Sequence, residues 1–336
     1  MVSRKPDAPE IGEFLNELTE EDWVRRNERR WWPQFLFHYT DLLNAVNILQ
    51  DGYLYSRESA ESEGKLRVSS GSPNVLDSTA LEIKRCVRLY FRPKTPTQFH
   101  VEGIRSSQIL QESKFPAAHC PVMIFFLFDA GDFLTRVRCE FSDGNLGSSK
   151  ARRLSTASEL RSLPWKKIYH QGPFDRSRYE EADISFRRSA EVIVPNRLSL
   201  SALKYIYCRS AAEKETLLHL LPQEVKQKYQ PRIISTTRNL LFFRQHTFVE
   251  TVRLSATSAR FHFSPETKSP GPFHLQIEVI SDSLDRMHIE QDDFYIDLRA
   301  PLEVNYPAPA FNYRMRLKLD QHIAYENRYF DQEIPF

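Results

Sequence analysis

The spacing of apolar residues changes twice along the chain. In residues 1–30, four apolar side chains recur at helical spacing within a charged segment, which predicts a loosely attached helix. Residues 31–229 contain short apolar runs of strand length between short helical patterns. In residues 230–336, apolar and polar positions alternate in runs typical of antiparallel strands with one solvated face. We therefore predict an N-terminal helical extension, a central mixed domain and a C-terminal antiparallel β module with these boundaries.

Four segments of the central domain have strand character, namely 35–39, 87–91, 121–128 and 205–208. The third of them does not alternate, which predicts a strand buried on both faces. Thr40 is a candidate N-cap for a helix that ends at Gly52, and Ser210 opens a capping-box match with Glu213. Residues 58–77, rich in serine, glycine and charge, predict a mobile loop.

The stretch 184–195 contains a single carboxylate, Glu191, within a β-branched apolar run. We predict a strand through this stretch, in which alternation places Arg187 with Glu191 on one face and Arg188 on the other. An acidic side chain in a buried strand is rarely found without an ionic or hydrogen-bond partner or a functional role. The plain alternatives are an edge-strand glutamate that faces water, or one that Arg187 and Arg188 neutralise.

Composition narrows the class of protein further. The chain has 336 residues, 41% of them hydrophobic, and a formal net charge of +2, so no overall basic field points to nucleic acid or to a membrane. Its four cysteines form no CxxC pair and show no metal-ligand spacing. Residues 1–20 lack the apolar segment of a secretory signal, and the longest apolar run is too short to span a bilayer. We expect a soluble, cytoplasmic protein with free thiols, no metal and no membrane contact.

Five motifs occur in a fixed order along the central domain. They are His38-Tyr39-Thr40, Leu89-Tyr90-Phe91-Arg92-Pro93-Lys94-Thr95-Pro96, Phe141-Ser142-Asp143-Gly144-Asn145, Leu163-Pro164-Trp165 and Arg188-Ser189-Ala190-Glu191. In this order the series resembles the DarT family of ADP-ribosyltransferases, toxins that transfer ADP-ribose from NAD onto bases in nucleic acid. The resemblance covers about residues 35–209. It implies an α+β fold with a split, mostly antiparallel sheet, flanking short helices and an NAD cleft between the halves of the sheet.

The resemblance also implies roles for individual residues. Glu191 matches the family's catalytic glutamate, which would stabilise an oxocarbenium-like centre and take a proton from the incoming base. Arg85 matches a required arginine upstream of the Tyr-Phe strand, with Arg57 as the second choice. The residues implied for NAD binding are His38, Tyr39, Thr40, Arg57, Tyr90 and Arg92. Those implied for contact with nucleic acid are Lys94, Asn145, Arg187 and Arg188.

Several of these residues also have ordinary interpretations. His38 taken alone fits a core histidine bonded to backbone, and Arg92 with Lys94 fits a solvated turn. Asn145 stands where the family has histidine, so the base that is modified could differ. Arg314, Arg316 and Lys318 share a strand face that fits either phosphate contacts or plain solvation.

The resemblance implies an acceptor base in single-stranded DNA or RNA, because base nitrogens are inaccessible inside a duplex. It also implies a toxin–antitoxin or phage-defence setting. The C-terminal module is a candidate for the docking of an antitoxin or a chaperone, or for target selection. Two rival hypotheses stay open. The chain could modify protein or hydrolyse NAD without an acceptor, or it could be an inactive module that binds a partner.

Overall fold

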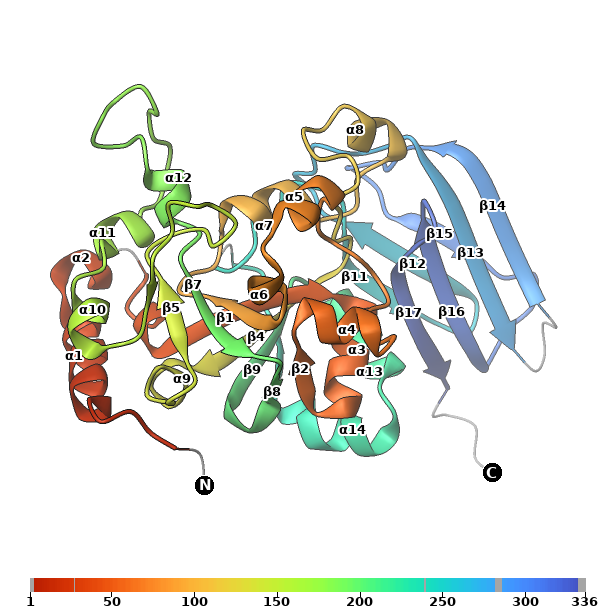
Figure 1. Cartoon of the computed structure of the whole chain (residues 1–336). Coiled ribbons are helices and arrows are strands. Elements are labelled where there is room, and N and C mark those ends of the chain that lie inside the picture. The colour runs from red at the N-terminus through yellow and green to blue at the C-terminus, as the bar shows by residue number, and fades with distance from the viewer. Residues whose placement is uncertain (1–2, 27, 239, 282–285, 332–336) are drawn as a thin grey trace.

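The structure is a computed structural model that describes residues 3–26, 28–238, 240–281 and 286–331. Figure 1 shows two β-rich units side by side, the first coloured red to green and the second cyan to blue. Helices at the N-terminus, a mixed central part and antiparallel C-terminal sheets follow one another along the chain. None of the helices within the described ranges is both long enough and apolar enough to cross a membrane.

An eight-stranded sheet organises the first unit. Its strands are β1 (Phe35–Asp41), β3 (Cys86–Tyr90), β4 (Met123–Asp129), β5 (Glu140–Ser142), β6 (Arg153–Leu154), β7 (Glu191–Pro195), β9 (Leu203–Cys208) and β10 (Ile233–Ser235). They lie in the order β10-β9-β4-β1-β3-β7-β5-β6, and all neighbouring pairs are antiparallel except β9 with β10. A separate ribbon pairs β2 (Tyr53–Tyr55) with β8 (Arg197–Ser199). Because β10 belongs to the large sheet, that sheet extends past the predicted boundary at residue 230.

The sheet opens between β1 and β3. Strands β1 and β4 share seven registered pairs, whereas β1 and β3 share one, Phe37 with Tyr90. The residues of β4 are buried on both faces up to Asp129, as the unbroken apolar run predicts. The prediction of a split, mostly antiparallel α+β fold is confirmed, and the split leaves room for a cleft beside Arg88.

Short helices surround this sheet. They are α1 (Ala8–Glu20), α2 (Asp22–Arg25), α3 (Leu42–Asp51), α4 (Arg57–Ser62), α5 (Pro73–Ser78), α6 (Leu81–Lys84), α7 (Pro96–Val101), α8 (Ser107–Gln111), α9 (Ala130–Leu134), α10 (Ala157–Arg161), α11 (Trp165–Ile168), α12 (Ile184–Arg187), α13 (Ala211–Leu220) and α14 (Gln223–Tyr229), with 3₁₀ turns at Trp32–Gln34, Leu200–Ala202 and Gln230–Arg232. The predicted loop 58–77 thus contains α4 and α5, because Ser56 caps the first and Pro73 starts the second. Asp41, not Thr40, caps α3 through a bond to the amide of Leu43.

Helix α1 is part of the core, so the prediction of a loose attachment is wrong. Ile11, Phe14, Leu15 and Leu18 are buried and belong to the same apolar cluster as the large sheet. The Phe14 ring lies 5.8 Å from that of Trp165. Burying one apolar stripe holds the helix in place, although its other face is charged.

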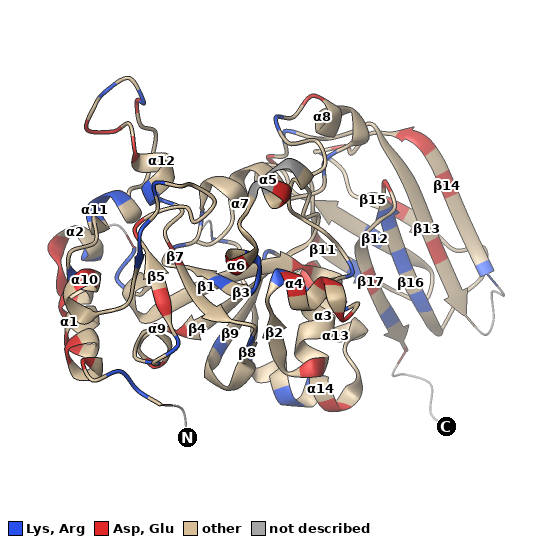
Figure 2. Ribbon diagram, viewed as in Figure 1, with Lys and Arg blue, Asp and Glu red and all other residues tan. Residues whose placement is uncertain are grey.

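Two antiparallel sheets form the second unit. The smaller contains β11 (Val249–Leu254), β12 (Ser258–Phe263) and β15 (Leu302–Asn305), and the larger, in spatial order, β14 (Arg286–Phe294), β13 (Phe273–Ser281), β16 (Asn312–Leu319) and β17 (His322–Phe330). Alternate residues of β13 and β16 are buried in a core shared by both sheets, as the sequence predicts. The basic residues of β16, blue in Figure 2, alternate with its buried residues. Among them, Arg316 pairs with Glu326 and Glu278.

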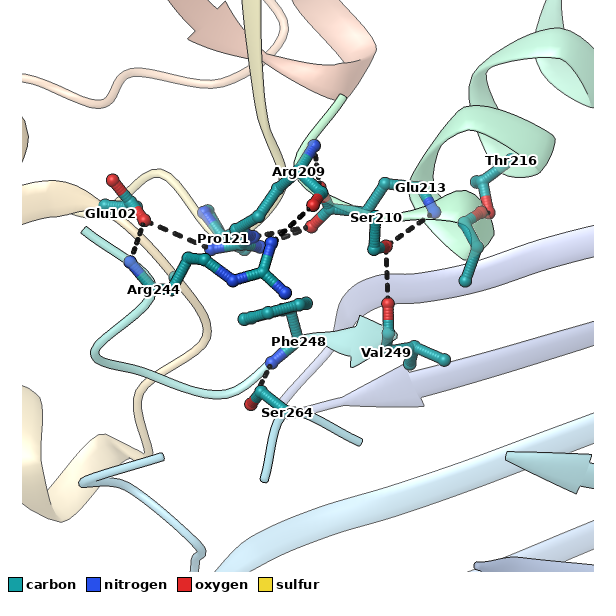
Figure 3. A network of polar contacts seen from close by, with 12 residues as sticks. Glu102, Pro121, Arg209, Ser210, Glu213, Thr216, Arg244, Phe248, Val249 and Ser264 are labelled. Carbon is teal, nitrogen blue, oxygen red and sulfur yellow. Dashed lines mark hydrogen bonds and ion pairs between the residues drawn. The ribbon is translucent and has the colours of Figure 1, made fainter. Parts of the chain in front are cut away.

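A buried ionic network joins the two units (Figure 3). Arg209, at the end of β9, is fully buried and pairs with Glu213 of α13. Glu102, which follows α7, accepts the backbone N–H groups of Phe243 at 2.9 Å and Arg244 at 2.8 Å. Arg244 in turn donates to the carbonyl oxygen of Arg209 at 2.7 Å. These bonds fix the segment that enters the second unit against the first.

The packing of α1 predicts the result of truncating one of its side chains. Replacing the buried Phe14 with alanine leaves a cavity in the core and should lower the free energy of unfolding by about 3–5 kcal/mol in urea denaturation. Asn16→Ala, an exposed change on the same helix, should alter it by less than about 0.5 kcal/mol. Equal stability of the two variants would show that the helix is not part of the core.

Candidate active site

Glu191 lies at the start of β7, opposite Tyr90 of β3. Its side chain is only 1% exposed, and both carboxylate oxygens have donors. Arg88 donates to Oε1 from Nε at 3.0 Å and from Nη2 at 2.5 Å, and the amide of Leu146 donates to Oε2 at 3.1 Å. Burial raises the pKa of Glu191, although the Arg88 guanidinium opposes this shift. The carboxylate is therefore held in one orientation and is easier to protonate than one in water.

The segment before Glu191 is not a strand, which corrects the predicted alternation of Arg187 and Arg188. Residues Ile184–Arg187 form α12, and the strand begins only at Glu191. Strand β3 ends at Tyr90, so the residues before Glu191 have no registered partner on it and bond to their own turn instead. Arg187 pairs with Asp143 and Asp183, both at 2.8 Å. Arg188 donates to the ring of His170 and the carbonyl of Gly172.

The structure thus gives Glu191 a different partner from the one considered in the neutralisation alternative. That partner is Arg88, in the middle of β3, where it shares the cleft face with Tyr90. Arg85 lies at the end of α6 with a side chain that is 56% exposed, and it pairs with Glu58 at 3.1 Å. The pattern Val87-Arg88-Leu89-Tyr90 could have revealed Arg88, because alternation puts it on the face of Tyr90.

The side chain of His38 contacts the backbone of the same strand, β3. Its Nδ1 lies 3.0 Å from the carbonyl oxygen of Arg88, which can only accept, so Nδ1 carries the proton. Burial lowers the pKa of His38 to about 4, so the ring is neutral at pH 7. Next to it, the rings of Tyr39 and Tyr90 stack at 5.9 Å. Burial and the nearby Glu191 raise the pKa of Tyr90 to about 12, which keeps its hydroxyl protonated.

A cavity lies at the opening of the sheet, between β1, α3, β2 and the residues that follow α4. Its lining includes His38, Tyr39, Thr40, Arg57 and Arg88, which brings four of the predicted NAD-binding residues together. Lys65 and Tyr55 also line it, and Asp51 is the one acidic residue among its described walls. Cations, hydroxyls and an aromatic ring are the groups that a dinucleotide requires, so this donor set fits NAD.

Arg92 lies outside this cavity. It is 2% exposed, its guanidinium lies 5.1 Å from the Trp32 ring, and it donates to the carbonyls of Pro93 at 2.9 Å and Ile168 at 3.0 Å. It is therefore not a solvated turn residue. Lys94 lines a second cavity on the other side of this turn, together with Arg92 and Arg188.

The loop after β5 covers Glu191. Ser142 is fully buried, and its hydroxyl accepts the amide of Glu191 at 3.0 Å and donates to the carbonyl of Gly144 at 2.6 Å. Asn145 is in the same loop, where its amide donates to the carbonyl of Phe186 at 3.2 Å, one residue before the Leu146 amide that binds Glu191. Sequence reasoning missed Ser142 and Leu146, because one acts through a hydroxyl and the other through backbone.

No group of three or more His, Cys, Asp or Glu side chains in the described parts of the chain could hold a metal ion. All four cysteines are free and buried.

Comparison with known proteins identifies the family. The profile of the family described as "ssDNA thymidine ADP-ribosyltransferase, DarT" matches residues 37–237, more than half of the chain. The chain therefore belongs to the DarT family, and it is an NAD-dependent ADP-ribosyltransferase. The predicted family, NAD as the substrate and single-stranded nucleic acid as the acceptor class are confirmed. The family description specifies DNA.

Solved structures with a similar fold come from the same family. DarT of Thermus sp. 2.9 in complex with ADP-ribosylated ssDNA is 16% identical, with 63% of this chain and 97% of that one aligned and a TM-score of 0.48. The same protein in complex with NAD+ is also 16% identical, with 63% of this chain and 98% of that one aligned and a TM-score of 0.46. DarTG of Thermosipho africanus in complex with ADP-ribose is 15% identical, with 66% of this chain and 53% of that one aligned and a TM-score of 0.44. No curated protein matches the chain significantly.

The loop that covers Glu191 depends on a glycine. A Cβ on Gly144 would lie 2.2 Å from the ring of Phe186, so Gly144→Ala must displace either that ring or the loop. Because the same loop carries Ser142 and Leu146, we expect the turnover number to fall about tenfold in a steady-state assay of ADP-ribose transfer. Gly131→Ala, whose added Cβ would meet only Asp129 Oδ1 at 3.4 Å, should keep full activity. Full activity of Gly144→Ala would mean that the loop does not position Glu191.

Proposed function

We propose that this chain transfers ADP-ribose from NAD to a thymine base of single-stranded DNA. The observation that carries the proposal is the buried carboxylate of Glu191, which Arg88 fixes beside a cation-lined cavity. The family of the chain supports thymidine in single-stranded DNA as the acceptor. RNA, protein and water become outcomes of the test below.

The cavity at the opening of the sheet would hold NAD, which supplies the ADP-ribosyl group and the nicotinamide leaving group. Arg57 and Lys65 offer positive charge to the pyrophosphate, although each already pairs with a carboxylate and would have to exchange partners. Thr40 and the neutral His38 offer hydrogen bonds to ribose hydroxyls. Tyr90, stacked on Tyr39, offers a ring against which nicotinamide can pack.

Glu191 would act on the reacting carbon and on the acceptor. As the bond between ribose C1′ and the nicotinamide nitrogen breaks, its carboxylate stabilises the positive charge on the ribose. The new bond joins C1′ to the one thymine ring nitrogen that carries a proton, N3. That proton passes to the Glu191 carboxylate, whose raised pKa favours accepting it, and nicotinamide leaves as a neutral molecule.

We assign to Arg88, in place of Arg85, the role of the arginine that the family requires. Its two bonds to Oε1 leave the carboxylate little freedom to rotate, and it also lines the cavity. Arg85 pairs with Glu58 and does not line the cavity. Arg88 therefore can contact both Glu191 and a bound dinucleotide.

Asn145, one residue from the Leu146 amide that binds Glu191, remains our candidate for contact with the acceptor base. Lys94 and Arg188 line a cavity next to the site and remain our candidates for contact with the DNA strand. Arg187 could contact a phosphate only by breaking its ion pairs with Asp143 and Asp183. Of the four residues proposed to contact DNA, it would therefore have to give up the most to do so.

An enzyme that modifies DNA bases needs control in its own cell. We therefore propose a cytoplasmic toxin that an antitoxin neutralises, in a toxin–antitoxin or phage-defence system. The second unit, which lies outside the family match, is the proposed docking site for an antitoxin or a chaperone. The four free, buried cysteines are consistent with a reducing compartment.

Replacing Glu191 with glutamine removes the charge but keeps the shape of the side chain. With labelled NAD and a thymidine-containing single strand, we expect at least a hundredfold loss of labelled DNA, because charge stabilisation and proton removal are both lost. The measurement compares that strand with one lacking thymidine, with total RNA and with a protein extract, and it records free ADP-ribose as the product of transfer to water. Label in RNA or protein alone would replace the proposed acceptor, and equal labelling by Glu191→Gln would contradict the assigned role.

The two arginines can be compared directly. Arg88→Lys keeps the charge but loses the two-point contact with Oε1, so the initial rate of DNA labelling should fall at least about tenfold. Arg85→Lys changes an exposed pair with Glu58 and should keep the rate within twofold. Circular dichroism would confirm that both variants fold. A larger loss in Arg85→Lys would restore the original assignment.

A further inference from the structure

A second cavity of about 710 Å³ lies next to the site and shares no residue with the NAD cavity. We call it the aromatic groove. Its walls come from three parts of the chain, namely the turn and helix at 92–100, the segment 171–188 and Phe243. Figure 1 shows the second of these as a long loop that projects beside α12.

The lining of the groove has the chemistry of a site for a flexible polyanion. It contains four basic side chains, Arg92, Lys94, Arg176 and Arg188, and its described walls include no acidic residue. The Nε atom of Arg188 is buried and has no hydrogen-bond partner within the described residues. A groove lined by cations attracts phosphates.

Aromatic rings alternate with these cations. Phe99 is 46% exposed, and its ring lies 5.2 Å from that of Phe243 in an edge-to-face arrangement. Arg188 lies over the ring of Phe174 at 4.9 Å. Phe174 and Phe243 are half-buried. Accessible rings between basic side chains are the platforms on which unpaired bases stack, and a duplex cannot offer its bases in this way.

The groove lies where a strand that carries the reacting base would continue. Arg188 precedes Glu191 by three residues, and Arg92 follows Tyr90, the residue paired with Glu191, by two. A base at Glu191 and its neighbours in the groove would therefore belong to one continuous strand.

Phe243 comes from outside the family domain, because the family match ends at residue 237. Its position is nevertheless fixed from within that domain. The buried Glu102 accepts the amides of Phe243 and Arg244, and Gln98 of α7 binds both Glu102 and the carbonyl of Leu241. The contacts of Glu102 thus place Phe243, a residue of the downstream segment, opposite Phe99.

We infer that the aromatic groove binds the single-stranded DNA that flanks the modified base, and that Phe243 adds a stacking platform supplied by the segment leading to the second unit. The inference rests on the proposed function for the identity of the strand. It assigns to the connection between the two units a direct part in acceptor binding.

The test measures binding of the full chain to a fluorescent single strand of twenty thymidines by anisotropy, without NAD. Phe99→Ala and Phe243→Ala should each weaken binding about five- to hundredfold, which is the range for removing one stacking platform. Phe243→Trp should restore it. Phe311→Ala, which removes a ring of similar exposure from the second unit, is the matched control and should bind as the unchanged protein does. The corresponding duplex should bind more weakly than the single strand.

Calorimetric titration with NAD separates a lost strand contact from general damage, because both groove variants should keep NAD affinity within twofold. If the unchanged protein labels DNA but both phenylalanine variants bind the strand normally, the groove inference is wrong and the proposed function stands. If binding to DNA and to NAD falls together, and Phe243→Trp does not restore it, the ring is structural and the inference is also overturned. If the unchanged protein does not label DNA, the proposed function fails on the separate Glu191 assay.

Discussion

The ion pair between Arg88 and Glu191 is the interaction around which the proposed active site is built. A carboxylate that is 1% exposed would be costly to bury without a partner, and Arg88 offsets that cost with two bonds to one oxygen. The surrounding elements position the two side chains of this pair. Strand β3 carries Arg88, β7 carries Glu191, and the loop after β5 supplies the Leu146 amide and the Ser142 hydroxyl. The pair also needs the sheet to be open between β1 and β3, because a continuous ladder there would leave no cleft at Arg88.

A second set of buried charges links this site to the rest of the molecule. Arg209, Glu213 and Glu102 lie in the first unit, and the residues that Glu102 holds begin the path into the second. Removing one member of such a network leaves an uncompensated charge, so the arrangement of the two units is specified tightly. The same Glu102 that joins the units also positions Phe243 in the aromatic groove. Attachment of the extra unit and shaping of the acceptor surface therefore depend on one carboxylate.

Much of the fold followed from local patterns, and the errors have physical causes. The alternation in β13 and β16 and the unbroken apolar run of β4 were predicted correctly, since each depends on which faces are buried. The helical turn before Glu191 was missed because apolar spacing over a few residues fits helix and strand alike, and the end of β3 decided between them. Arg88 was not among the candidates named from the sequence, because motif order locates a segment, whereas the direction of a side chain depends on strand register.

The sequence by itself determined the family, the α+β class and the antiparallel second unit, because these depend on residue order and on periodic burial. It also proposed Glu191 as the catalytic carboxylate. Only the tertiary structure decided which arginine meets Glu191, that α1 belongs to the core, and that Arg92 binds carbonyls. It alone brought Phe243 to Phe99. Contacts between residues distant in sequence are set by strand register and by the pairing of buried charges, and neither leaves a periodic trace in the chain.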